Sequence, residues 1–153
     1  MEKILFGAGC FWGVEESFRK LPGVNKTEVG YSGGNTNFPT YESVCTGETN
    51  HAEVVFLEYD ENVISLDKLA EHFWKCHDPT SLNRQGPDIG TQYRSAIFYF
   101  NQFQKEVLNN SKNAYSKKNN INIVTEITEF KNYYKAEEYH QKYIEKTGLY
   151  CAS

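Results

Sequence analysis

The chain has 153 residues, the length of one ordinary domain, and two full-sized domains do not fit in it. Apolar residues make up 39% and aromatic residues 15% of the sequence, which excludes a disordered chain and predicts a buried core. Sixteen Lys and Arg residues against twenty Asp and Glu residues give a net charge of -4, so the overall charge does not favour nucleic acid or anionic lipid as a partner.

The N-terminal segment is unlike an export signal. Residues 1–6 hold only a short apolar stretch, and acids follow at Glu15 and Glu16, which fits neither a signal peptide nor a transit peptide. No apolar run reaches the length of a membrane span. We therefore expect a cytoplasmic protein without membrane contact, in which the four cysteines stay reduced and any disulfide is transient.

Hydrophobic periodicity predicts an alternation of strands and helices. A period of two indicates strands, and apolar residues three and four apart indicate helices. In chain order, the predicted elements are strand 3–8, helix 10–20, strand 24–31, strand 52–59, helix 65–76, strand 94–100, helix 102–117, strand 121–130 and helix 135–147.

This order of elements contains a split β-α-β-β-α-β unit. It predicts an α/β (α+β) fold, namely a two-layer, ferredoxin-like plait with a mixed β-sheet, flanking helices and long loops. We expect residues 1–153 to form a single domain and a monomer, with a flexible C-terminal tail at 148–153.

Two long irregular segments interrupt the pattern. Residues 32–50 are rich in Gly, Thr, Asn and Ser, and residues 77–93 are punctuated by Pro79, Gly86 and Pro87. Loops longer than about 12–15 residues inside a compact domain are usually functional or disordered. We expect both segments to carry function.

Cys10 follows a predicted strand and a Gly-Ala-Gly turn, and it opens a predicted helix. Backbone N–H groups and the dipole at a helix N-terminus stabilise an anion and lower the pKa of a thiol. Cys10 is therefore a candidate nucleophile, although a small buried hydrophobic residue fits the same position. The neighbouring rings of Phe11 and Trp12 can cradle a methyl or thioether group, or they can pack in the core.

Glu53 shares one face of the predicted strand 52–59 with Val55. A carboxyl buried there without a cation has a raised pKa and stays protonated, as a general acid requires. The same pattern also fits a strand end at which Glu53 faces water. Tyr41 and Tyr93 lie in the two long loops, and either phenol can donate a hydrogen bond to a developing oxyanion.

Cys151 lies close to the end of the predicted tail, after Gly148. A thiol on such a tether can reach a second cysteine, which suits a resolving role, whereas an idle terminus is the alternative. Cys45 and Cys76 fall in a loop and at a helix end, and we interpret both as structural or incidental.

Two other kinds of site have weaker support. A metal site lacks C-x-x-C and H-E-x-x-H spacing, and Glu137-x-x-His140 matches only half of a di-iron motif. The strand, Gly-Ala-Gly turn and helix imitate a dinucleotide-binding opening, but Trp12 stands where that fingerprint has its third glycine. We expect neither a metal ion nor a resident cofactor.

Five sequence blocks stand out along the chain. They are GCFWG at 9–13, GYSGG at 30–34, TGETNHAE at 46–53, HDPTSLNRQGPDIGTQYRS at 77–95 and AEEYHQKY at 136–143. In this order, and over nearly the whole chain, they resemble the A-type peptide methionine sulfoxide reductases. The resemblance implies a two-layer α/β plait, no metal, and reduction of the S epimer of methionine sulfoxide.

The resemblance also implies a role for each candidate residue. Cys10 matches the catalytic nucleophile, Glu53 the acid that protonates the sulfoxide oxygen, and Cys151 the resolving cysteine. Tyr41 and Tyr93 match phenols that hydrogen-bond to that oxygen. The implied substrate-binding residues are Phe11 and Trp12, which wall the methyl group, and Asp88, which helps to organise the pocket.

The implied chemistry agrees with these residue types. Attack by the Cys10 thiolate releases methionine and leaves a sulfenic acid, which the Cys151 thiol converts to a disulfide. An external dithiol, thioredoxin by the resemblance, restores the enzyme, and the implied substrates are oxidised proteins or free methionine sulfoxide. A redox-sensing module that forms the Cys10–Cys151 bond only as a switch is the non-enzymatic alternative.

Overall fold

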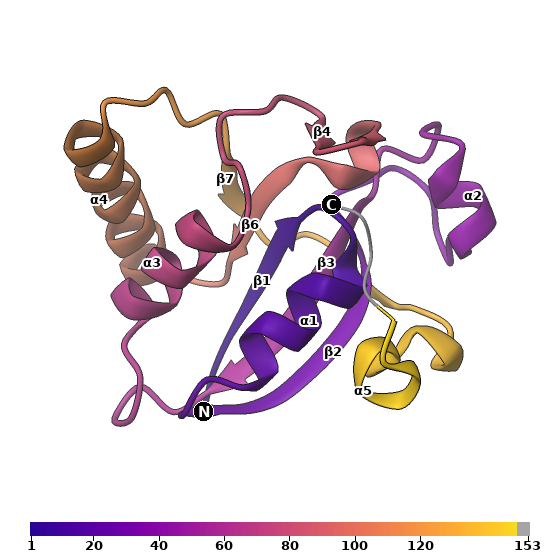
Figure 1. Ribbon diagram of the computed structural model, residues 1–153, viewed down its shortest axis with the longest axis horizontal. Helices are drawn as coiled ribbons and strands as arrows, with labels where there is room; N and C mark the ends of the chain where they lie inside the picture. Colours follow the sequence, from indigo (N-terminus) through magenta and orange to yellow (C-terminus); the bar gives the residue numbers. More distant parts are fainter. Residues whose placement is uncertain (150–153) are drawn as a thin grey trace.

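The computed structural model describes residues 1–149, and its centre is a six-stranded sheet (Figure 1). The strand order is β7-β6-β1-β3-β2-β8. All neighbouring strands in this sheet are antiparallel except β6 and β7, which are parallel, so the expected mixed sheet is confirmed. The strands are β1 (Glu2–Ala8), β2 (Val24–Ser32), β3 (Ala52–Tyr59), β6 (Ser95–Tyr99), β7 (Glu126–Glu129) and β8 (Tyr134–Lys135).

One face of the sheet packs against helices. Helix α1 (Phe11–Arg19) lies across the front of the sheet in Figure 1, and α3 (Leu66–Cys76) lies beside α4 (Gln102–Asn119). The ring of Phe6 on β1 stacks on Phe18 of α1 at 4.9 Å and on Phe73 of α3 at 5.0 Å between ring centroids. Apolar residues at helical spacing therefore dock both helices onto the same strand.

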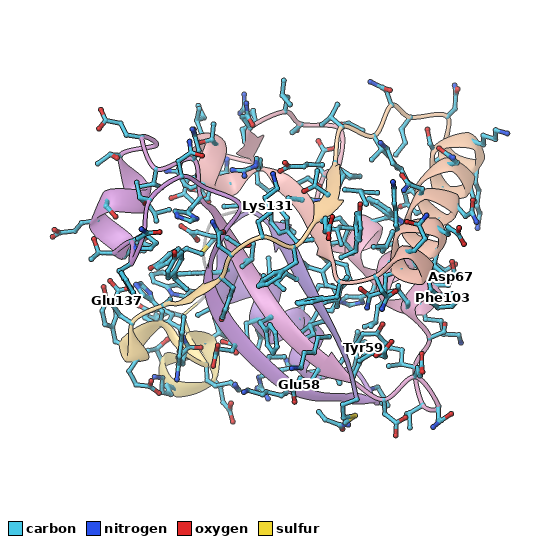
Figure 2. The ribbon with its side chains drawn as sticks, turned by 180° about the vertical axis from the view of Figure 1, so that it is seen from behind. Glu58, Tyr59, Asp67, Phe103, Lys131 and Glu137 are labelled. Atoms are coloured by element: carbon cyan, nitrogen blue, oxygen red, sulfur yellow. The ribbon has the colours of Figure 1, made fainter. Side chains whose placement is uncertain are left out.

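The opposite face of the sheet is covered by extended chain. Leu5, Val54 and Phe98 point to this face and form a second, smaller core. Phe130 and Tyr133 pack on that core, because the segment between β7 and Glu137 runs across the back of the sheet (Figure 2). The same segment carries the chain from one edge of the sheet to the other.

The predicted helix 135–147 is wrong for most of its length. Tyr134–Lys135 forms β8 on the edge of β2, and only a 3₁₀ turn η2 (Glu138–His140) and α5 (Tyr143–Thr147) are helical. The break lies at Lys142, whose φ of 54° is left-handed and whose backbone N–H donates to the Glu15 carboxylate at 2.7 Å. A contact distant in sequence therefore overrides the local periodicity.

Other predicted boundaries also shift. Strand 121–130 shortens to β7, and the backbone N–H of Val124 instead bonds to the Pro79 carbonyl at 2.9 Å. Both predicted loops contain short elements. These are α2 (Tyr41–Cys45) in the first, and β4 (Arg84–Gln85), β5 (Asp88–Ile89) and the 3₁₀ turn η1 (Thr91–Tyr93) in the second.

Within residues 1–149, no helix has the length and apolar character needed to cross a membrane. The predicted tail at 148–153 lies mostly outside the described residues, which end at Leu149.

Candidate active site

Cys10 stands at the junction of β1 and α1. Gly9 makes the turn between them with a φ of 95°, a left-handed conformation that glycine adopts without strain. Cys10 then occupies the N-cap position of α1 and is partly buried. A thiolate at this position faces the positive end of the helix dipole.

Glu53 lies on β3 beside the start of α1. Its side chain is only 1% exposed, and it points to the helix-covered face, as Val55 does. The backbone N–H of Phe11 donates to Glu53 Oε1 at 3.2 Å. The sheet thus carries a buried carboxyl to the residue that follows Cys10.

Two tyrosines from the long loops approach the same carboxyl. Tyr41 opens α2, whose N-cap is Thr40, and Tyr93 ends η1. Burial raises the pKa of both phenols well above its usual value, and the charge of Glu53 raises both further. Both tyrosines therefore remain hydrogen-bond donors at neutral pH.

Further groups lie within electrostatic reach of Tyr93. The charges of Cys45, Asp88 and Cys10 also raise its pKa, after burial and Glu53. Asp88 comes from β5, whose hairpin with β4 belongs to the second long loop. The structure therefore gathers Cys10, Glu53, Tyr41, Tyr93 and Asp88 around one end of the sheet.

The two predicted wall residues have different surroundings. The Phe11 ring is buried, and its centroid lies 6.4 Å from that of Tyr41. Trp12 is only partly buried and stacks on Tyr143 with centroids 3.8 Å apart. The expected resolving residue, Cys151, lies outside the described residues.

The remaining cysteines differ from each other. Desolvation raises the pKa of the Cys45 thiol, the nearby Tyr41 phenol opposes this shift, and the acidic side chains of Glu53 and Glu137 add to it. Burial raises the pKa of the Cys76 thiol to about 12, which keeps it protonated and unreactive at neutral pH. In the part of the chain that the structure covers, no three Cys, His, Asp or Glu side chains gather as metal ligands.

The chain was compared with known protein families. A sequence profile described as peptide methionine sulfoxide reductase matches residues 2–153. The chain belongs to the peptide methionine sulfoxide reductase family.

Relatives within the peptide methionine sulfoxide reductase family are similar in sequence. One from Lactuca sativa, named peptide methionine sulfoxide reductase, is 52% identical over 145 residues, which cover 95% of this chain and 56% of the relative. The chain thus spans little more than half the length of that relative. Another, from Clostridium perfringens and named peptide methionine sulfoxide reductase MsrA, is 53% identical over 152 residues, which cover 99% of this chain and 97% of the relative.

Solved structures share the fold. Mxr1 from Saccharomyces cerevisiae in reduced form matches with a TM-score of 0.94 at 39% identity, over 99% of this chain and 88% of Mxr1. Mxr1 in complex with Trx2 matches with a TM-score of 0.67 at 29% identity, over 93% of this chain and 84% of that chain.

Two further residues contact this candidate site and were not among the residues expected from the sequence. Glu137 accepts hydrogen bonds from the Tyr31 hydroxyl at 2.8 Å and from the Tyr41 backbone N–H at 2.9 Å. Burial opposes its ionisation, but hydrogen bonds that include these two outweigh burial and hold the pKa of Glu137 below its usual value. His140 Nδ1 accepts the Trp12 indole N–H at 2.9 Å. The Glu137-x-x-His140 spacing is present in the sequence, but there it indicates only half of a metal-binding motif.

Proposed function

We propose that this protein reduces the S epimer of methionine sulfoxide, free or protein-bound, to methionine with the Cys10 thiolate as nucleophile. Membership of the peptide methionine sulfoxide reductase family supports this activity. The observation that carries the proposal is the hydrogen bond from the Phe11 N–H to Glu53, because it joins a buried acid to the residue after Cys10. A sulfoxide sulfur needs both a nucleophile and a proton on its oxygen to react.

In the proposed reaction, Phe11 and Trp12 wall the substrate methyl group, and Asp88 helps to organise the pocket. The phenols of Tyr41 and Tyr93 donate hydrogen bonds to the sulfoxide oxygen while Glu53 transfers a proton to it. The Cys10 thiolate attacks the sulfoxide sulfur. This attack joins the Cys10 sulfur to the substrate sulfur. The protonated oxygen then passes to the Cys10 sulfur as the sulfur–oxygen bond of the substrate and the new sulfur–sulfur bond break. Methionine leaves with its sulfur reduced, and Cys10, oxidised by two electrons, is left as a sulfenic acid.

The proposed cycle closes through Cys151. Its thiol condenses with the Cys10 sulfenic acid, releases water and forms a Cys10–Cys151 disulfide. A thioredoxin dithiol then reduces this disulfide and is itself oxidised, so the protein needs no resident cofactor. The complex of the yeast relative with Trx2 supports a partner of this kind.

We propose that residues 1–153 form one cytoplasmic, monomeric domain with a ferredoxin-like plait at its centre. The antiparallel order β6-β1-β3-β2, with α1 between β1 and β2 and α3 between β3 and β6, supports the plait. The match of the family profile to residues 2–153 supports a single domain.

The proposal is tested by turnover of methionine S-sulfoxide with dithiothreitol. We expect Cys10→Ser to lose at least about 10³-fold in rate, because a hydroxyl is a far weaker nucleophile than a thiolate. Cys76→Ala is the matched control and should keep the activity, since the Cys76 thiol is buried and protonated. Equal rates for Cys10→Ser and the parent protein would refute the proposed nucleophile, and failure of the parent protein to turn over more than once would refute an enzyme.

The same assay tests the proposed resolving role of Cys151. We expect Cys151→Ser to turn over with dithiothreitol but poorly with thioredoxin, because the dithiol reagent reduces a sulfenic acid directly. Substrate without reductant should lower the intact mass of the parent protein by two hydrogens, in a bond that digestion maps to Cys10 and Cys151. Unchanged thioredoxin turnover would show that Cys151 is not the resolving residue and would move that role to Cys45.

A further inference from the structure

The indole of Trp12 is held from two sides. Tyr143 stacks on its face with an interplanar angle of 13°, and the His140 imidazole accepts its N–H at 2.9 Å. Stacking alone leaves the indole free to slide or rotate in its own plane, whereas a hydrogen bond at Nε1 sets that rotation. The His140 bond therefore fixes the direction in which the indole N–H points.

The hydrogen bond also fixes the chemical state of His140. An indole N–H is only a donor, so Nδ1 must be the unprotonated nitrogen and the proton of the neutral ring lies on Nε2. Burial lowers the pKa of His140, which the charge of Lys146 reinforces and that of Glu137 opposes. The ring is therefore a neutral acceptor at neutral pH.

A histidine at position 140 destabilises the fold relative to an apolar ring of similar size. Its side chain is 1% exposed and is surrounded by the rings of Phe11, Tyr41 and Tyr139, at 5.2, 4.5 and 4.1 Å between centroids. Within residues 1–149, its Nε2 is buried without a hydrogen-bond partner. A buried N–H without an acceptor destabilises a fold, and a phenylalanine would fill the same aromatic site without that cost.

We propose that His140 is a positioning residue, which orients the Trp12 indole as the wall of the substrate pocket beside Cys10. This inference rests on the proposed function, because it assigns the indole to the substrate methyl group. His140 contacts neither the reacting sulfur nor its oxygen in this role. It acts on binding through Trp12, so its loss raises KM more than it lowers kcat.

Three variants test the proposal with free methionine S-sulfoxide and dithiothreitol. We expect His140→Phe to keep or raise the midpoint of thermal unfolding and yet to raise KM about tenfold, the effect of one lost hydrogen bond. His140→Asn places an amide oxygen close to the position of Nδ1, so it should restore KM to within about threefold of the parent value. Trp12→Phe lacks the donor, so adding His140→Phe to it should change KM no further.

Each outcome decides between the alternatives. A parent-like KM for His140→Phe would overturn the positioning role while the proposed function stands. The same conclusion would follow if His140→Phe raised KM by the same factor in the Trp12→Phe variant as in the parent protein. If the parent protein does not reduce the sulfoxide, the proposed function fails.

The orientation of Trp12 can be tested without activity, from its fluorescence in a Trp74→Phe background. There, His140→Phe should shift the emission maximum and His140→Asn should not. An unchanged emission in His140→Phe would refute the contact itself.

Discussion

Glu53 is the residue that we propose as the proton donor, and the fold determines its surroundings. The carboxyl is buried on the helix-covered face of β3, and one of its oxygens is already engaged by the Phe11 N–H at 3.2 Å. We predict that Glu53→Gln lowers kcat/KM by about 10²–10⁴, the usual contribution of a general acid. Some activity should remain, because an amide donates a hydrogen bond although it cannot release a proton.

The matched control for this prediction is Glu48→Gln, on an exposed side chain of the same sequence block. It should react at the parent rate in the same steady-state assay. Full activity in Glu53→Gln would mean that another group, such as Tyr41 or Tyr93, supplies the proton.

The site residues differ in how visible they are in the sequence. Cys10 could be singled out because a glycine turn and a helix start are local features, and the structure has both. The burial of Glu53 could not be decided, because alternation along a strand does not reveal whether its first residues face water. Glu137 and His140 contact Tyr41 and Trp12, which lie about a hundred residues away in the chain, and no local pattern encodes such contacts.

Among the elements, α1 holds the C-terminal segment in part through the buried carboxylate of Glu15. Glu15 is 1% exposed and accepts hydrogen bonds from the Thr27 hydroxyl at 2.8 Å, the Lys142 backbone N–H at 2.7 Å and the Lys142 ammonium at 3.2 Å. These bonds also hold Lys142 in its left-handed conformation. The contact determines where α5, and with it Tyr143, lies against the first turn of α1.

We predict that Glu15→Gln lowers the free energy of unfolding by about 1–3 kcal/mol, less than for a fully buried ion pair because the Lys142 side chain is 39% exposed. Urea unfolding followed by circular dichroism measures the loss. Glu138→Gln is the control in the same segment, since its pair with Lys135 is exposed on both sides and should contribute less than about 1 kcal/mol. Equal losses in the two variants would show that the buried carboxylate does not anchor the segment.

The elements themselves could be predicted to different degrees. The predicted strand 52–59 has the same ends as β3. The predicted helices that correspond to α1 and α3 also agree closely with the structure, because each helix buries one apolar face against the sheet. Residues 120–142 could not be predicted in the same way. Their conformation follows from contacts with Pro79, Val29 and Glu15, which lie in other parts of the chain.

At the scale of the whole molecule, His77 joins the helical layer to the sheet. Its Nδ1–H donates to the Phe73 carbonyl at the end of α3, and Nε2 accepts the Ser95 hydroxyl of β6, each at 2.7 Å. The Ser95 hydroxyl is in turn 2.7 Å from that of Thr125. The buried ring is neutral in this arrangement, because a protonated ring would place a charge there and would have to donate to the Ser95 hydroxyl oxygen instead of accepting from it.

The stability of the fold should therefore fall on mild acidification. Burial lowers the pKa of His77 from 6.5 in the unfolded chain to about 4 in the folded protein. The hydrogen bond to the Phe73 carbonyl and the charge of Asp78 oppose this shift but do not outweigh it. Because the folded pKa is the lower one, the stabilisation is complete above pH 6.5 and is lost between pH 6.5 and 4, by roughly 3 kcal/mol at most. We predict this decline in urea unfolding at successive pH values, with a smaller slope in His77→Gln. Ser65→Ala, which removes the N-cap of α3, should lower stability at every pH but keep the parent slope, and a parent slope in His77→Gln would assign the decline to other groups.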